Sequence, residues 1–165
     1  MATQTKVPLG EYLRTSYHPD REFLDGEVLE RSVGGYPHSR VQGRLSLALG
    51  KLSGAPPLYI CPELRVQVAE NRYRVIDLAV YREAEPAERF PSVPPFIAIE
   101  ILSPTDPTAD TFQKLEEYSS WGVSHIWLID PEARRLFVYD QSALRAVDKL
   151  ELSELRAEIL AASIF

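Results

Sequence analysis

The segment Phe96–Leu102 constrains the fold more than any other part of this chain, because six of its seven residues are apolar. A strand of this composition is covered on both faces, in a sheet that carries helices on both sides. A second apolar run, His125–Ile129, follows a helical pattern from about Ala109 to Trp121, which Gly122 terminates. Together these segments predict a right-handed crossover that joins two parallel strands.

The remaining segments predict a chain of the α/β class, of the α+β type, with helices packed on the faces of one mixed sheet. The expected elements are a short helix or turn at 8–13, a hairpin at 22–29, a helix from Pro37 to about Gly54, strands at 64–68, 73–81 and 136–139, and an apolar tail at 150–165. The tail is ambiguous between strand and helix. We expect a single domain over 1–165, with an N-terminal hairpin and helix (about 8–54), a core (about 57–140) and the tail.

Length and cysteine content narrow the class of protein. A chain of 165 residues can bury a core without a disulfide or a structural metal. Cys61 is the only cysteine, which excludes an intrachain disulfide and a four-cysteine zinc site and suits a reducing cytoplasm. We find neither a secretory signal pattern nor an apolar run of membrane-spanning length, so we expect a cytoplasmic protein with no membrane partner.

The net charge of −6 is distributed unevenly along the chain. Residues 1–74 contain ten Lys or Arg and eight Asp or Glu, whereas residues 75–165 contain eight and sixteen. A nucleic acid is therefore expected to contact mainly the N-terminal half. The candidates for phosphate contacts are Arg14, Arg21, Arg40 and Arg44, because a guanidinium binds phosphate through two hydrogen bonds. The alternative for each is a solvated surface arginine.

Two acids interrupt apolar strands, where acids are rare. Asp77 lies within Val75–Val80, and Glu100 lies within Phe96–Leu102. A buried carboxylate is costly unless it is paired or binds a cation. Two of them on neighbouring strands suggest a shared Mg²⁺ or Mn²⁺, with the Ile101 carbonyl as a further oxygen ligand. Structural ion pairs with arginines are the alternative.

Three further positions have two interpretations each. Asp110, Lys114 and Tyr118 share one side of the expected helix, so Lys114 either faces the two acids or forms an exposed pair with Asp110. His38 is either a site residue or a helix-end residue on the surface. Glu22 is either an additional site acid or an exposed carboxylate of the hairpin.

An ordered set of motifs resembles a known family over about residues 10–140. The set consists of Glu22 with Asp25-Gly26-Glu27, then His38, Asp77, Glu100–Pro104, Asp110, Lys114, Tyr118 and 122–131. It resembles the Uma-type restriction endonuclease family, a branch of the PD-(D/E)XK nuclease superfamily. The resemblance implies a restriction-endonuclease-like core and Mg²⁺-dependent cleavage of phosphodiester bonds.

The resemblance also implies roles for individual residues. Asp77 corresponds to the acid of the Pro-Asp motif, Glu100 to the second acid, and Glu22 to an acid that relatives contribute from the first helix and hairpin. Ile76 replaces the proline of the motif. Leu102 stands where the superfamily usually has its lysine, and Lys114 occupies the position on the following helix to which this branch moves that lysine.

These observations predict a Mg²⁺-dependent endonuclease that hydrolyses nucleic acid, with DNA as the expected substrate. The alternative is a catalytically inactive or non-nuclease oligomeric binding protein that keeps the nuclease fold. A metal hydrolase for another substrate is a third possibility. The apolar tail at 158–165 predicts a homo-oligomer, either a dimer or a dimer of dimers, in which the tail is buried. Packing of the tail on the chain's own core is the rival explanation.

Overall fold

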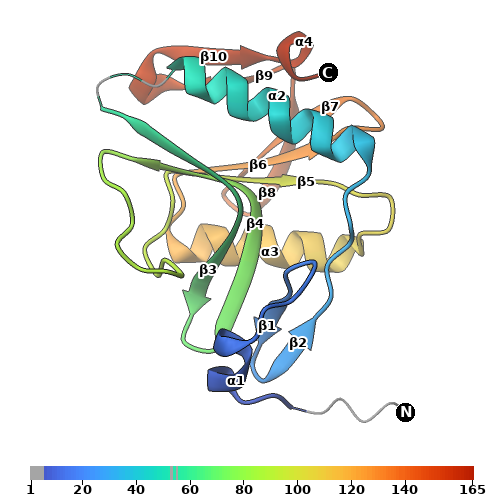
Figure 1. Cartoon of the computed structure of the whole chain (residues 1–165). Coiled ribbons are helices and arrows are strands. Elements are labelled where there is room, and N and C mark those ends of the chain that lie inside the picture. The colour runs from blue at the N-terminus through green and yellow to red at the C-terminus, as the bar shows by residue number, and fades with distance from the viewer. Residues whose placement is uncertain (1–5, 53, 55) are drawn as a thin grey trace.

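Strand β5 (Ile97–Ile101) lies inside an eight-stranded mixed sheet, as Figure 1 shows for the computed structural model. The structure describes residues 6–52, 54 and 56–165. The other strands of this sheet are β1 (Glu22–Leu24), β2 (Glu27–Leu29), β3 (Leu58–Ala69), β4 (Arg72–Arg82), β6 (His125–Asp130), β7 (Arg135–Asp140) and β8 (Ala143–Val147). Their order is β2-β1-β4-β5-β6-β7-β8, and β3 pairs with β4. The predicted mixed sheet is confirmed.

The crossover predicted from the two apolar runs is present. All five residues of β5 are buried, and β5 pairs in parallel with β6, whereas the other strand pairs are antiparallel. Helix α3 (Thr108–Trp121) connects them and ends at Gly122, which adopts the left-handed conformation with φ 103°. Ala98 faces the core on the α3 side, whereas Ile97 and Ile99 face the opposite core. The sheet is therefore covered on both faces.

The opposite face is covered by α2 (Tyr36–Leu52) and by the C-terminal segment (Figure 1). That segment forms a two-stranded sheet of β9 (Lys149–Leu152) and β10 (Ala157–Leu160), with a 3-10 turn at Ser153–Leu155 between the strands, and ends in α4 (Ala161–Ile164). Ile159, Ile164 and Phe165 are buried in the same core as the apolar face of α2. Packing within the chain thus accounts for the apolar tail.

Strand β4 has one continuous edge and one divided edge. β3 follows one edge over almost the whole length of β4. On the other edge, β1 pairs with β4 at Tyr73 and Arg72, and β5 pairs with it only from Leu78 to Val80. The backbone of β4 between these two contacts has no strand partner on that side. The divergence of β1 and β5 opens the space in which the candidate site lies.

The N-terminal hairpin and α1 (Leu9–Arg14) pack at the far end of β4. Asp25 and Gly26 both have positive φ, 52° and 101°, as the Asp-Gly turn predicts. Tyr12 and Phe23 stack with ring centroids 5.0 Å apart, and Tyr73 of β4 completes this small core. The contact fixes the hairpin, and hence Glu22, against the end of β4.

Two strands differ from the sequence prediction: β3 is longer than expected, and β8 was not expected. β3 begins at Leu58 rather than at residue 64, and it contains Pro62 and a Glu63 with φ 51°. Proline is tolerated there because β3 pairs only with β4 and is an edge strand. Strand β8 was not predicted, because it is a partly exposed edge strand with little apolar pattern. Among the described residues, no helix is long and apolar enough to cross a membrane.

Candidate active site

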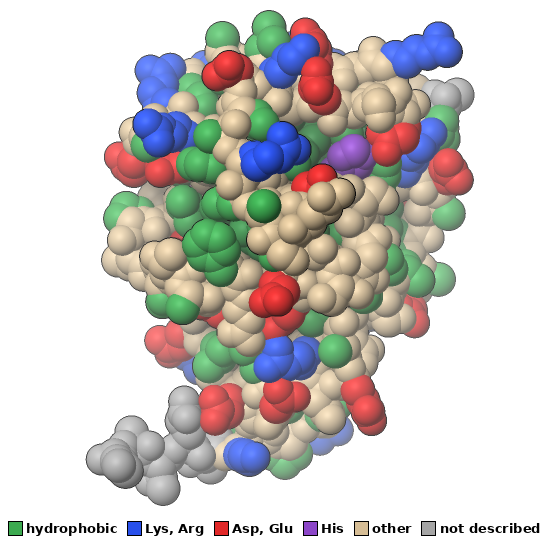
Figure 2. Space-filling view, turned by 180° about the vertical axis from the view of Figure 1, so that it is seen from behind, with side chains coloured by type: hydrophobic (Ala, Val, Ile, Leu, Met, Phe, Trp, Pro, Cys, Tyr) green, Lys and Arg blue, Asp and Glu red, His purple; other side chains and the backbone are tan. Residues whose placement is uncertain are grey.

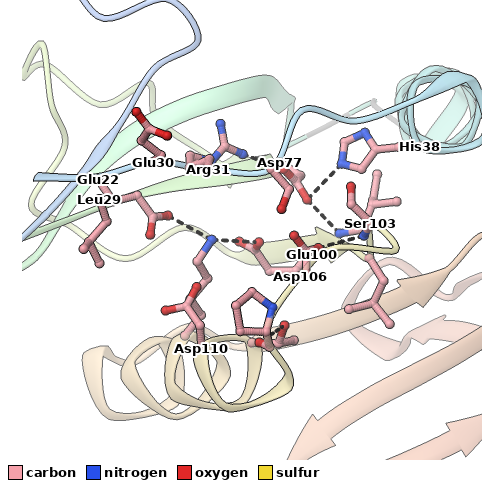
Figure 3. Close-up of a pocket in the computed structure, with 16 residues that line it drawn as sticks. Glu22, Leu29, Glu30, Arg31, His38, Asp77, Glu100, Ser103, Asp106 and Asp110 are labelled. Atoms are coloured by element: carbon pink, nitrogen blue, oxygen red, sulfur yellow. Dashed lines mark hydrogen bonds and ion pairs between the residues drawn. The ribbon is translucent and has the colours of Figure 1, made fainter.

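A pocket of about 320 Å³ opens at the divided edge of β4 (Figure 3). Asp77 of β4, Glu100 of β5, Glu22 of β1 and Lys114 of α3 all line it, and so does His38 of α2. These side chains come from five different elements and from opposite faces of the sheet. The two strand acids and the helix lysine that the sequence singles out are therefore brought together.

Asp77 is buried and has three polar neighbours. Its Oδ1 accepts a hydrogen bond from Arg31 Nη2 at 2.7 Å, and its Oδ2 accepts one from the Ile101 N–H at 2.8 Å. His38 Nε2 lies 3.3 Å from the same Oδ2. Burial alone would raise the pKa of Asp77, but the hydrogen bond from His38 and the charge of Arg31 lower it below its ordinary value. Asp77 is thus held as a carboxylate.

The same contact shifts the pKa of His38 in the opposite direction, upward. Burial would lower its pKa, but the hydrogen bond to Asp77 and the charges of Asp77 and Glu63 raise it above the ordinary value. The close approach of the preceding loop also restrains the ring, because a Cβ on Gly34 would lie 2.6 Å from it. His38 therefore lines the pocket and is held in place by its surroundings, and the surface position considered from the sequence is wrong because the residue is buried.

The charge of the buried Glu100 is offset less completely by its neighbours than the charge of Asp77. Its Oε1 accepts a hydrogen bond from the Tyr118 hydroxyl at 2.7 Å, and Lys114 Nζ lies 3.5 Å from its Oε2. Burial raises the pKa of Glu100 to about 7; Lys114 opposes the shift, whereas the charges of Asp77 and Glu22 add to it. Tyr118 thus holds the Glu100 carboxylate, whose pKa is raised, whereas the pKa values of Asp77 and Glu22 are lowered.

Lys114 bridges two carboxylates instead of forming an exposed helix pair. Its Nζ lies 2.9 Å from Glu22 Oε1 and 3.5 Å from Glu100 Oε2, and the residue is 8% exposed. Burial would lower the pKa of Lys114, but Glu100 and Glu22 raise it, so the ammonium stays charged. Asp110 contacts Arg74 instead, at 3.2 Å. The alternative of an exposed Asp110–Lys114 pair is therefore wrong.

Glu22 is buried, so the interpretation as an exposed hairpin carboxylate is also wrong. Its Oε1 accepts a hydrogen bond from the Val75 N–H at 3.1 Å, and its Oε2 lies 2.7 Å from Arg74 Nη1. The Val75 N–H belongs to the part of β4 between the two contacts on its divided edge. Burial opposes the charge of Glu22, but Lys114 and Arg74 lower its pKa below the ordinary value. Glu22 therefore links the pocket to a buried arginine.

Two important arginines were not identified from the sequence. Arg74 is fully buried and also contacts Glu117, with Nε 2.7 Å from Oε2. Arg31 lies between β2 and α2, lines the pocket and contacts Asp77. The only sequence signal for Arg74 was a charged residue next to the apolar run of β4. For Arg31, in a loop, the sequence contains no such signal.

The four arginines proposed for phosphate contacts do not line this pocket. Arg40 and Arg44 both donate hydrogen bonds to a main-chain oxygen of Phe165, at 3.3 and 3.0 Å, because one face of α2 packs on the C-terminal segment. Arg21 pairs with Glu30 at 2.7 Å, and Arg14 is exposed in the last turn of α1. On the face drawn in Figure 2, described basic side chains are interspersed with acidic ones.

The donor chemistry of the pocket fits a hard divalent cation. Asp77, Glu100 and the Ile101 carbonyl offer oxygen atoms, and Mg²⁺ characteristically takes one or two carboxylates and keeps several waters. The raised pKa of Glu100 marks negative charge that such a cation would neutralise. Among the residues that the structure describes, we find no group of three or more His, Cys, Asp or Glu side chains placed so that they could hold a metal ion. The fit therefore rests on two carboxylates, one of which Arg31 contacts.

Asp77, Glu100, Glu22 and Lys114 thus meet at one pocket of a mixed sheet. The chain belongs to the Uma2 family, described as "Putative restriction endonuclease", whose sequence profile matches residues 10–162. The family expected from the sequence motifs is thereby confirmed.

A solved structure supports the fold independently. It is described as "a putative nuclease belonging to DUF820 from Anabaena variabilis", with a TM-score of 0.85 and 19% sequence identity over 96% of this chain and 97% of that one. At this identity the similarity establishes the fold. Among curated proteins, none matches this chain significantly.

Proposed function

We propose that this protein is an endonuclease that requires Mg²⁺ or Mn²⁺ and hydrolyses phosphodiester bonds in nucleic acid, with DNA as its substrate. The observation that carries the proposal is the convergence of Asp77, Glu100 and Lys114 in one pocket. Buried like charges weaken a fold, because each carboxylate must be desolvated beside the other. A nuclease has a use for this arrangement, whereas a purely structural protein does not.

The proposed roles follow from the contacts. Asp77, Glu100 and the Ile101 carbonyl would hold the cation, which when bound lowers the pKa of a coordinated water and stabilises charge on the phosphate. Ile101 N–H and His38 hold the Asp77 carboxylate, and the Tyr118 hydroxyl holds the Glu100 carboxylate. These partners restrict how the two acids can rotate.

Lys114 supplies the positive charge that Leu102 cannot. Leu102 follows the end of β5 at the wall of the pocket, two residues after Glu100. The ammonium of Lys114 reaches the same region from α3, and its contacts with Glu22 and Glu100 hold it there. A fixed ammonium stabilises the negative charge that develops on phosphate during hydrolysis.

One observation favours a second candidate, a binding protein that keeps the nuclease fold without cleaving. Both Asp77 oxygens already have partners, because Arg31 contacts Oδ1, and Ile101 N–H and His38 contact Oδ2. In such a protein, the acids would serve only as ion-pair partners. The two candidates differ in one respect that can be measured, which is cation-dependent cleavage.

The test is cleavage of DNA and RNA panels with Mg²⁺, with Mn²⁺ and with EDTA. We expect wild-type protein to cleave DNA only with a divalent cation, and Asp77→Ala to be inactive. Glu116→Gln, which removes an exposed acid from α3, is the matched control and should cleave like wild type. Equal product from wild type and Asp77→Ala would instead indicate a contaminating nuclease and support the binding protein.

The homo-oligomeric state and the cytoplasmic location remain predictions. The apolar tail no longer requires a partner, because it packs within the chain; light scattering at micromolar concentration would separate a dimer from a monomer of 18.7 kDa. Cys61 is a free thiol, which suits the cytoplasm.

A further inference from the structure

Arg31 bridges the candidate metal ligand Asp77 and a carboxylate outside the pocket, Glu63, and the proposed nuclease does not yet give this bridge a role. Its Nη2 lies 2.7 Å from Asp77 Oδ1, and its Nη1 lies 2.7 Å from Glu63 Oε2. The Arg31 side chain is 12% exposed, whereas the Glu63 side chain is 47% exposed. The guanidinium therefore joins a buried acid, beside which Figure 3 shows Arg31, to a more exposed one.

Glu63 is held where it can keep Arg31 after the contact with Asp77 is lost. It has a φ of 51° and is skipped in the pairing of β3 with β4, between Pro62 and Leu64. Gln42 Nε2 donates a hydrogen bond to Glu63 Oε1 at 2.9 Å, so both carboxylate oxygens have partners. A non-glycine residue in the left-handed conformation within a strand marks a local conformation that the surroundings impose.

The backbone that carries Arg31 is also fixed. Thr105 Oγ1 donates a hydrogen bond to Ser32 Oγ at 3.1 Å, which ties this loop to the segment after β5 across the pocket. Gly34 passes so close to His38 that a Cβ would not fit at its present position. A change of partner at Arg31 would therefore be a movement of its side chain, without rearrangement of the loop.

We propose that Arg31 is a built-in counter-cation for Asp77, which a divalent cation displaces and which then binds a phosphate of the nucleic acid. The proposal rests on the proposed function, because it takes Asp77 as a ligand of the cation. A divalent cation that binds Asp77 Oδ1 competes with the Arg31 guanidinium for this oxygen, and the two positive charges repel each other at that distance. Arg31 then keeps Glu63 and has free N–H groups, whose planar arrangement matches phosphate oxygens.

The first test measures cation binding without reference to cleavage. In calorimetric titrations of the full chain with Mn²⁺, Arg31→Gln should bind Mn²⁺ about tenfold more tightly than wild type, within the usual range for two coupled ligands. Arg31→Lys keeps the charge but has one ammonium in place of the two guanidinium nitrogens that contact Glu63 and Asp77, so it should shift the affinity in the same direction by a smaller factor. Arg145→Gln, which removes an exposed arginine of β8, is the control and should match wild type.

Titration at high salt separates direct competition between Arg31 and Mn²⁺ for Asp77 from an effect of the protein's net charge on Mn²⁺ affinity. In about 1 M KCl the screening length falls to about 3 Å, so distant charges no longer contribute. Competition for one carboxylate persists under these conditions. If the advantage of Arg31→Gln disappears in high salt, the effect is one of net charge and the proposal is overturned.

The second test uses inorganic phosphate as the probe. Protein-bound Mn²⁺ should accelerate the ³¹P relaxation of phosphate held beside it in wild type, and Arg31→Gln should lose most of this acceleration although it binds Mn²⁺. Unchanged Mn²⁺ affinity or unchanged relaxation in Arg31→Gln overturns the role of Arg31. If Arg31→Gln behaves like wild type but Asp77→Ala no longer binds Mn²⁺, only the role of Arg31 is overturned, and the proposed nuclease stands. If neither wild type nor Arg31→Gln binds Mn²⁺, both proposals fail.

Discussion

Replacing Glu100 with Gln should stabilise the protein at high pH, because the substitution removes a buried charge and keeps the shape. The pKa of Glu100 rises from 4.5 to about 7 on folding, mainly through burial. Since the folded state holds this proton more tightly, the associated stability is complete below pH 4.5 and is lost as the pH rises through about 7. A shift of this size corresponds to about 3 kcal/mol.

The measurement is urea unfolding of wild type and Glu100→Gln in EDTA at about pH 5 and about pH 8. Between these values, linkage predicts that Glu100→Gln gains about 2–3 kcal/mol on wild type. Mg²⁺ should reduce the difference, because a bound cation favours the carboxylate form. Glu116→Gln serves as the control for loss of an exposed acid. A difference between wild type and Glu100→Gln that stays constant with pH would refute the reasoning that the partners of Glu100 only partly offset the cost of burying its charge.

Two further predictions concern the cations around the pocket. Lys114→Ala should lower the cleavage rate by about two to three orders of magnitude, the usual effect of losing one preorganised electrostatic group, while Mn²⁺ binding persists; adding Leu102→Lys should restore part of the rate, and an unchanged rate in Lys114→Ala removes this lysine from the mechanism. Arg74→Met should lower the free energy of unfolding by about 3–5 kcal/mol, because it removes the fully buried cation that pairs with Glu22 and Glu117 and leaves Glu22 with Lys114 as its one cationic partner among the contacts described above. Urea unfolding beside Arg145→Met measures this, and a loss near that of the control would contradict the prediction.

The sequence predicts the centre of the fold and the centre of the site for the same reason. In Phe96–Leu102, an apolar run defines a buried strand, so Glu100 stands out as an acid that needs a partner. Asp77 stands out in the same way within β4. Both arguments depend only on local pattern and on the energy of burying charge, which are readable without knowledge of distant contacts.

The remaining contacts depend on tertiary structure that no local pattern encodes. Arg31 reaches Asp77 from a loop 46 residues earlier in the chain, and Arg74 reaches Glu22 across 52 residues. Arg44 was assigned to phosphate because of its charge, but the packing of α2 directs it to a main-chain oxygen of Phe165. For arginine, whose long side chain serves both ion pairs and ligands, sequence position alone does not distinguish the two uses.

The central claim is that Asp77 and Glu100 together hold a divalent cation, and Mn²⁺ calorimetry tests it most directly. We predict one Mn²⁺ bound per chain by wild type and by Glu116→Gln, and binding lost in Asp77→Ala and strongly weakened in Glu100→Gln. Far-ultraviolet circular dichroism should show that each variant is folded. Equal Mn²⁺ binding by wild type and folded Asp77→Ala would contradict the account.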